Sequence, residues 1–191
     1  MGLEIIKFEI KGAAPLILKN GQTADPGNKW AKAIKKVSGK RNKTDDDYAE
    51  LSHLEWLGAL YLDEKGRICI PANNLLGCVL KGGKQFKLGP KINAGVFERE
   101  EFTELRYDGP NDPEKLFKNK RFVDSRLVVV QRARIVRTRP IFREWGLTVA
   151  LNVNTDVIDV ADVEQSVVRA GEVIGMGDYR PRYGRFEVER L

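Results

Sequence analysis

The order of the predicted elements indicates an α+β fold, and three strongly periodic segments support that order. Residues 3–11 and 145–153 alternate between apolar and polar side chains, as half-buried strands do. Residues 159–174 carry apolar side chains at helical spacing behind Asp159, a typical N-cap. The full order is strand, inserted region, helix, strand, strand, helix, strand. This is the order of a ferredoxin-like (RRM-like) βαββαβ core, with a basic helical insertion after strand one.

The first half of the chain predicts one long strand, three helices and a hairpin. Residues 13–18 extend the first strand beyond a kink at Pro15. Asp25 as N-cap and Pro26 in the first turn predict a helix that continues through residue 37. Residues 38–47 form a charged loop, and residues 48–60 a second helix. A hairpin over residues 61–70 turns near Gly66, and a third helix covers residues 70–83.

The second half predicts mainly strands. Short strands are expected over residues 94–97 and 104–107, followed by a short helical piece at 114–117. Residues 127–138 are rich in Val, Ile and Arg and predict one long strand. Asp159 begins the last helix, Gly175 ends it, and residues 185–191 form the final strand.

Composition favours a single domain over residues 1–191, with an inserted basic segment at 21–50 and an irregular insertion at 84–125. The 191 residues carry a net charge of +6, which favours acidic partners such as nucleic acid. Cys69 and Cys78 fit no zinc or redox spacing, so we expect buried free thiols in a reducing, cytoplasmic setting. We expect no membrane association, because no apolar run is long enough to span a bilayer.

An arginine-rich segment is the strongest local charge signal. Residues 118–143 contain nine Lys or Arg and a single acid, Asp124. Such a segment predicts a sheet surface that follows phosphates, or else a solvated face with ordinary ion pairs; the size of the imbalance favours phosphate binding. In an extended strand Arg132 and Arg134 project from one face, and Arg137 and Arg139 from the other. The candidate phosphate contacts here are Arg132, Arg134, Arg137, Arg139 and Arg143.

The loop before the last strand, GMGDYRPRYG, combines glycine, arginine and tyrosine. Arginine suits phosphates, and tyrosine rings suit stacked bases, so this loop predicts contact with a nucleic acid. Its candidate residues are Tyr179, Arg180, Arg182, Tyr183 and Arg185. Lys40 and Arg41 belong to a second basic zone, over residues 29–43. Taken alone, that zone is typical of a solvated lysine-rich helix.

Two motifs resemble those of the RAMP superfamily of CRISPR-associated proteins. Residues 70–77, IPANNLLG, resemble the superfamily's first helix start, and GMGDYRPRYGRF resembles its glycine-rich loop. Ala72 and Arg182 stand where that superfamily usually has glycine. The subgroup most similar to this chain is the guide-RNA-coating backbone subunits, with their phage and mobile-element relatives.

The resemblance implies a ferredoxin-like core and a single-stranded RNA or DNA ligand. It also implies head-to-tail homo-oligomers, as a filament or ring, with other effector-complex subunits as further partners. Asn73 and Asn74, within the helix motif, join the nucleic-acid-binding candidates.

The expected function is therefore non-catalytic, sequence-tolerant binding of single-stranded nucleic acid, without cofactor or metal. Two catalytic alternatives come from the same resemblance: His53 as a general base, and Asp25 as a metal-dependent RNA-cleaving carboxylate. The third alternative is an adaptor that binds only protein.

Overall fold

The strand β1 (Leu3–Gly12) is central to a four-stranded antiparallel sheet and confirms the strand predicted over residues 3–11. It pairs on one side with β8 (Gly146–Asn154) and on the other with β9 (Phe186–Arg190). The short β4 (Val96–Glu98) pairs with β8, so the strand order is β4-β8-β1-β9. The computed structural model describes residues 2–130 and 133–191.

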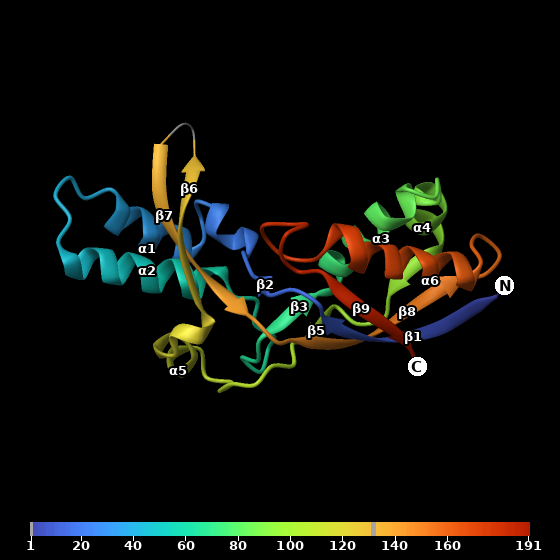
Figure 1. The fold of residues 1–191 in the computed structure, drawn as a ribbon. Helices are drawn as coiled ribbons and strands as arrows, with labels where there is room; N and C mark the ends of the chain where they lie inside the picture. The colour runs from blue at the N-terminus through green and yellow to red at the C-terminus, as the bar shows by residue number, and fades with distance from the viewer. Residues whose placement is uncertain (1, 131–132) are drawn as a thin grey trace. The chain divides into compact units, whose positions relative to one another are not determined.

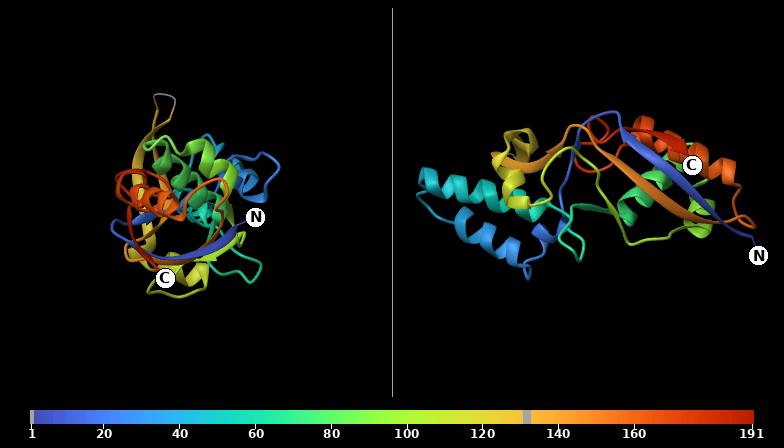
Figure 2. Two further views of the ribbon diagram at one scale, coloured as in Figure 1. Left: turned by 90° about the vertical axis from the view of Figure 1, so that its right-hand side faces the viewer. Right: turned by 90° about the horizontal axis from the view of Figure 1, so that it is seen from below.

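Two helices, α3 (Ala72–Lys84) and α6 (Val160–Arg169), lie on one face of this sheet (Figures 1 and 2). Alternation decides which side chains they cover, because Ile6, Phe8 and Ile10 are buried while the residues between them are more exposed. The absence of a side chain at Gly82 lets the two helices pack closely, because a Cβ there would lie 2.4 Å from the carbonyl oxygen of Ser166. The helix predicted over residues 70–83 is confirmed to within two residues.

Shorter elements complete this part of the chain. The strands β3 (Cys69–Pro71) and β5 (Phe102–Glu104) pair with each other, and α4 (Gly89–Gly95) precedes β4. The hairpin predicted over residues 61–70 is reduced to one isolated bridge, between Leu62 and Ile68, around Gly66 at φ +74°. The residues that follow the bridge, Cys69–Pro71, pair with β5.

A second set of elements packs around Trp56, which is fully buried and donates from Nε1 to the carbonyl of Phe122 at 2.9 Å. Its helices are α1 (Lys29–Ser38), α2 (Asp45–Ala59) and α5 (Pro113–Lys118), with short 3₁₀ turns η1 (Gly21–Ala24) and η2 (Lys120–Phe122). Its strands are β6 (Val123–Val130) and β7 (Ala133–Phe142), which form a hairpin, and the two-residue β2 (Leu16–Ile17).

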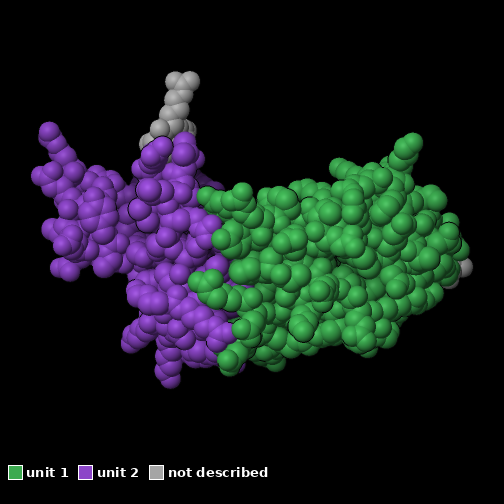
Figure 3. All heavy atoms as spheres, viewed as in Figure 1, with its two compact units in different colours: residues 1–16, 62–108, 143–191 green, residues 17–61, 109–142 purple. Residues whose placement is uncertain are grey.

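These elements form two compact units, drawn in two colours in Figure 3. Unit 1 comprises residues 1–16, 62–108 and 143–191, and unit 2 comprises residues 17–61 and 109–142. The predicted basic segment 21–50 lies within unit 2. The predicted insertion 84–125 is divided between the units at residue 108. The mixture of helix and sheet confirms the α+β class. No helix among the described residues is both long enough and apolar enough to cross a bilayer.

The start of α1 corrects one prediction. Asp25 does not cap this helix: the cap is Asn28, whose side chain accepts the N–H of Trp30 at 2.9 Å. Asp25 instead ends η1, and its carboxylate accepts the N–H of Gly27 at 2.8 Å in a local turn. An Asp-Pro pair suits a turn as well as a helix start, so the sequence pattern did not discriminate between them.

The arginine-rich segment corrects a second prediction. Residues 127–138 were expected to form one strand, but β6 ends at Val130 and β7 begins at Ala133. The two strands pair with each other in register, Leu127 opposite Val136 and Arg126 opposite Arg137. This hairpin belongs to unit 2, whereas the four-stranded sheet belongs to unit 1.

Candidate nucleic-acid interface

The glycine-rich loop between α6 and β9 is closed by backbone hydrogen bonds. α6 continues into a π-helical turn, η3 (Ala170–Ile174), in which the N–H of Gly175 donates to the carbonyl of Ala170 at 2.9 Å. The N–H of Met176 then donates to the carbonyl of Gly184 at 2.8 Å, which brings the two ends of the loop together. A π-turn inside a helix is uncommon and frequently marks a functional site.

The buried thiol of Cys78 attaches this loop to α3. Its Sγ lies 3.1 Å from the carbonyl oxygen of Gly175 and 3.7 Å from that of Ala170. Burial raises the pKa of Cys78 to about 12, so the group remains a neutral thiol that donates to these carbonyls. The expectation of a buried free cysteine is confirmed for both Cys69 and Cys78.

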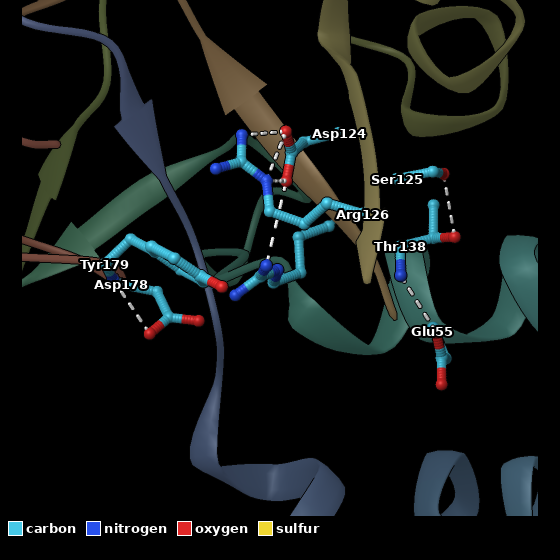
Figure 4. Close-up of polar contacts among 8 residues, drawn as sticks. Glu55, Asp124, Ser125, Arg126, Thr138, Asp178 and Tyr179 are labelled. Carbon is cyan, nitrogen blue, oxygen red and sulfur yellow. Dashed lines mark hydrogen bonds and ion pairs between the residues drawn. The ribbon is translucent and has the colours of Figure 1, made fainter. Parts of the chain in front are cut away.

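An open hollow of about 610 Å³ lies between α3 and the loop. Its wall combines two cations, one acid and several apolar groups. The lining residues are Lys81, Val173, Ile174, Gly177, Asp178, Tyr179, Arg180 and Pro181. Tyr179 has a φ of +62°, which is uncommon outside glycine and asparagine, and Asp178 supports it by accepting its N–H at 2.9 Å (Figure 4).

The two predicted tyrosines of the loop contact each other. The rings of Tyr179 and Tyr183 lie 6.2 Å apart, edge to face at 85°. Tyr179 is 38% exposed, whereas Tyr183 is half-buried. Tyr179 is therefore the better placed of the two to stack on a base, and Tyr183 supports its ring.

The loop arginines are available to a ligand. Arg180, Arg182 and Arg185 are all exposed, and within the described part of the chain none of them has a carboxylate within ion-pair distance. Arg169, the last residue of α6 and directly before η3, differs because it pairs with Glu172 at 3.3 Å and donates to Gln85 at 2.6 Å. The loop thus carries three exposed cations that form no ion pair with an acid of the described chain.

The hairpin arginines divide into two groups. Arg134 is exposed and opposite Val129, on one face, while Arg137 and Arg139 belong to the other, as predicted. Arg137 pairs with Glu55 of α2, and Arg139 is only 6% exposed and lies 3.7 Å from Asp124.

Figure 4 shows how acids hold this part of the hairpin. Glu55 accepts the buried N–H of Thr138 at 2.9 Å, and Asp124 accepts from Arg126 at 2.8 Å. Arg137 and Arg139 therefore have acidic partners within unit 2. This agrees with the alternative prediction for the segment, a solvated face with ordinary ion pairs. Arg132 lies outside the described residues.

The remaining candidates are scattered. Arg143 and Arg41 are exposed, whereas Lys40 pairs with Asp47, which lowers the pKa of Asp47. Asn73 and Asn74 lie in the first turn of α3, which contains no acidic residue and has no side-chain cap. A helix start of this kind favours anions through its free N–H groups, although by itself it defines no site.

The two catalytic alternatives lie in unit 2. The side chain of Asp25 is exposed, and His53 lies 2.9 Å from Glu114 and against the ring of Phe117. Among the described residues, no group of three or more His, Cys, Asp or Glu is arranged to hold a metal ion.

Lys81 lines the hollow but was not among the sequence candidates. It is exposed on α3, three residues after Cys78 and thus on a similar side of the helix. The sequence could have indicated Lys81 only through this helical spacing from Cys78, and the spacing points to the loop only once Cys78 is known to contact it.

Comparison with known proteins adds one structural likeness. No protein-family model matches this chain, and no curated protein sequence matches it. Among solved structures, Cmr6 from Pyrococcus furiosus aligns with 98% of this chain and 99% of its own, at 12% identity and a TM-score of 0.42.

Proposed function

We propose that this protein binds single-stranded nucleic acid, in the first instance RNA, without sequence preference and without catalysis. The observation that carries the proposal is the glycine-rich loop, which holds Arg180, Arg182 and Arg185 exposed and without an ion pair to any described acid. Each guanidinium presents several donors that match phosphate oxygens. Tyr179 adds an exposed ring beside them, which suits a base of any sequence.

The arrangement of unit 1 supports a ferredoxin-like core and membership of the RAMP superfamily. The strand order β4-β8-β1-β9 is that expected when α3 connects the first core strand to the second and α6 connects the third to the fourth. The two motifs also fall at the positions that the resemblance implies: IPANNLLG runs from β3 into α3, and GMGDYRPRYGRF connects η3 to β9.

The test measures fluorescence polarisation with a long single-stranded oligonucleotide at several salt concentrations. Arg180→Ala, Arg182→Ala and Arg185→Ala should each weaken binding and reduce the log–log salt slope by about 0.7, because each removes one phosphate contact. Arg169→Ala is the matched control, since that arginine is partly exposed but already paired. If the wild-type protein binds no single strand at low salt, or if all four variants behave alike, the proposal is wrong.

We further propose that the protein assembles along the strand. Within the described residues β9 pairs only with β1, so the outer edge of β9 is open to another chain. A contact between unlike surfaces of successive copies would produce a filament or a ring. Light scattering with and without a long oligonucleotide tests this, and a strictly monomeric mass in both conditions would contradict it.

One observation favours a second candidate function, metal-dependent RNA cleavage through Asp25. Because Asn28 caps α1, capping no longer accounts for the exposed carboxylate of Asp25. Our proposal nevertheless predicts no cleavage of single-stranded RNA, or of RNA paired to a bound guide, with Mg²⁺ or Mn²⁺. Turnover that Asp25→Ala abolishes while binding is retained would establish the second candidate instead. An adaptor without nucleic acid would show partner binding insensitive to salt and to nuclease.

A further inference from the structure

The hollow between α3 and the glycine-rich loop has the chemistry of a nucleotide-binding site. It combines apolar side chains that can contact a base with two cations that can contact a phosphate. Val173 and Ile174 are half-buried, so they form a wall with little freedom to collapse into the hollow. Pro181 and the ring of Tyr179 add exposed apolar surface.

Lys81 and Arg180 reach the hollow from different elements, α3 and the loop respectively. Lys81 follows Cys78 by three residues on α3, and Arg180 belongs to the loop that the Cys78 thiol contacts at the Gly175 carbonyl, so the two cations line the hollow from adjoining elements. Two cations that converge in this way, neither with an acidic partner among the described residues, fit a phosphate group.

The backbone around the hollow is held in place before any ligand arrives. The π-turn η3 carries Val173 and Ile174, and the Met176–Gly184 hydrogen bond closes the loop that carries Arg180. On the opposite side, a Cβ at Gly83 would lie 2.0 Å from Ile92, so α3 is tightly packed two residues after Lys81. A site that is already formed costs little ordering entropy on binding.

We propose that this hollow binds one nucleotide unit, with its phosphate between Lys81 and Arg180 and its base against the wall of Val173, Ile174 and Pro181. The proposal rests on the proposed function and deepens it, because it assigns Lys81 a role in binding. The nucleotide is either a unit of a bound strand or a free nucleoside monophosphate. Asp178 is the one acid that lines the hollow, so the phosphate lies toward the two cations and away from this carboxylate.

The experiment compares Lys81→Ala with Lys84→Ala, an exposed lysine of the same helix that does not line the hollow. One arm titrates adenosine 5′-monophosphate and adenosine by NMR, and the other titrates a long oligonucleotide at several salt concentrations. Lys81→Ala should weaken monophosphate binding roughly tenfold, as expected for one lost contact to a charged group. It should also reduce the salt slope for the strand by about 0.7, and Lys84→Ala should do neither.

The outcomes separate this proposal from the proposed function. If strands bind and the loop-arginine variants weaken them, but Lys81→Ala behaves like Lys84→Ala in both arms, the nucleotide site is refuted while strand binding stands. If no strand binds but Lys81→Ala weakens monophosphate binding, the hollow is a free-nucleotide site and the proposed function fails. Equal affinity for adenosine and its monophosphate would overturn the assignment of Lys81 to a phosphate. Lys81→Arg should retain binding in either arm, which distinguishes charge from shape.

Discussion

Glu55 is predicted to hold the arginine hairpin to α2, and substituting it should lower stability. It is 8% exposed and accepts from two partners on β7: the buried N–H of Thr138 at 2.9 Å, and the guanidinium of Arg137. Glu55→Gln keeps an acceptor for the N–H but removes the charge. The lost charge assistance is worth about 1 kcal/mol, and a partly exposed ion pair up to about 1 kcal/mol more. We therefore expect a loss of about 1–2 kcal/mol.

Glu55→Ala leaves the N–H of Thr138 without this acceptor. An unsatisfied buried donor costs about 1–3 kcal/mol, so Glu55→Ala should be the more destabilising of the two. Urea unfolding followed by circular dichroism measures both, with Glu50→Gln as the control on an exposed site of the same helix. If the free energy of unfolding of Glu55→Gln lies within about 0.5 kcal/mol of that of Glu50→Gln, Glu55 does not hold the hairpin to α2.

Glu55→Gln should strengthen strand binding even though it lowers stability. Glu55→Gln releases Arg137, so if strands bind as proposed, the salt slope should steepen by up to about 0.7. A variant that is less stable but binds more strongly at low salt cannot be explained by general unfolding. An unchanged slope would show that Arg137 lies away from the strand.

Two further predictions concern groups whose pKa the fold shifts. Burial raises the pKa of Cys69 to about 11 and that of Cys78 to about 12, so both thiols should react with a disulfide reagent at pH 8 about a hundredfold or more slowly than in urea; equal rates would contradict their burial. The hydrogen bond from Lys40 lowers the pKa of Asp47, so the pair stabilises the fold above the unfolded carboxyl pKa of about 4 and is lost as the pH falls below it. Urea midpoints at pH 7 and pH 3 should therefore differ less for Asp47→Asn than for the wild type, and an equal difference would refute the assignment.

Local periodicity predicted most of the core of unit 1. β1, β8, α3 and α6 each bury one face, and a single buried face leaves a clear period of two or of about 3.6 in the sequence. Boundaries were accurate where such a pattern ended on a glycine, as at Gly175. α4 was missed because its seven residues, GPKINAG, contain two glycines and no repeated apolar spacing.

The hairpin could not be predicted in this way. Residues 127–138 contain no Gly, Pro, Asn or Asp to indicate a turn, so two strands were interpreted as one. Its charge partners were hidden for a different reason. Glu55 lies more than 80 residues before Arg137 in the chain, and a net count over a short window cannot include it. The loop arginines were easier to interpret, because their basic character is visible in the local sequence and no described acid forms an ion pair with them.

Gly184 provides the sharpest test of the loop geometry. It has a φ of +72°, and a Cβ there would lie 1.8 Å from the carbonyl oxygen of Met176. Gly66 has nearly the same φ, +74°, but a Cβ there would meet nothing within 4 Å. Gly66→Ala should therefore cost only the left-handed conformation, about 1–2 kcal/mol. Gly184→Ala should cost about 1–3 kcal/mol more, because the overlap is with backbone and cannot be relieved by a side-chain rotation.

Urea unfolding of the two variants measures this difference in the free energy of unfolding. Fluorescence polarisation with an oligonucleotide shows whether each substitution also weakens binding. The carbonyl of Gly184 accepts the N–H of Met176, so displacing it opens the loop that holds Arg180 and Arg182. If the strand binds to this loop, Gly184→Ala should weaken binding at a temperature where it is still folded, and Gly66→Ala should not. Equal stability losses in the two variants would refute the close approach. A folded Gly184→Ala variant with full affinity would instead mean that strands bind elsewhere on the protein.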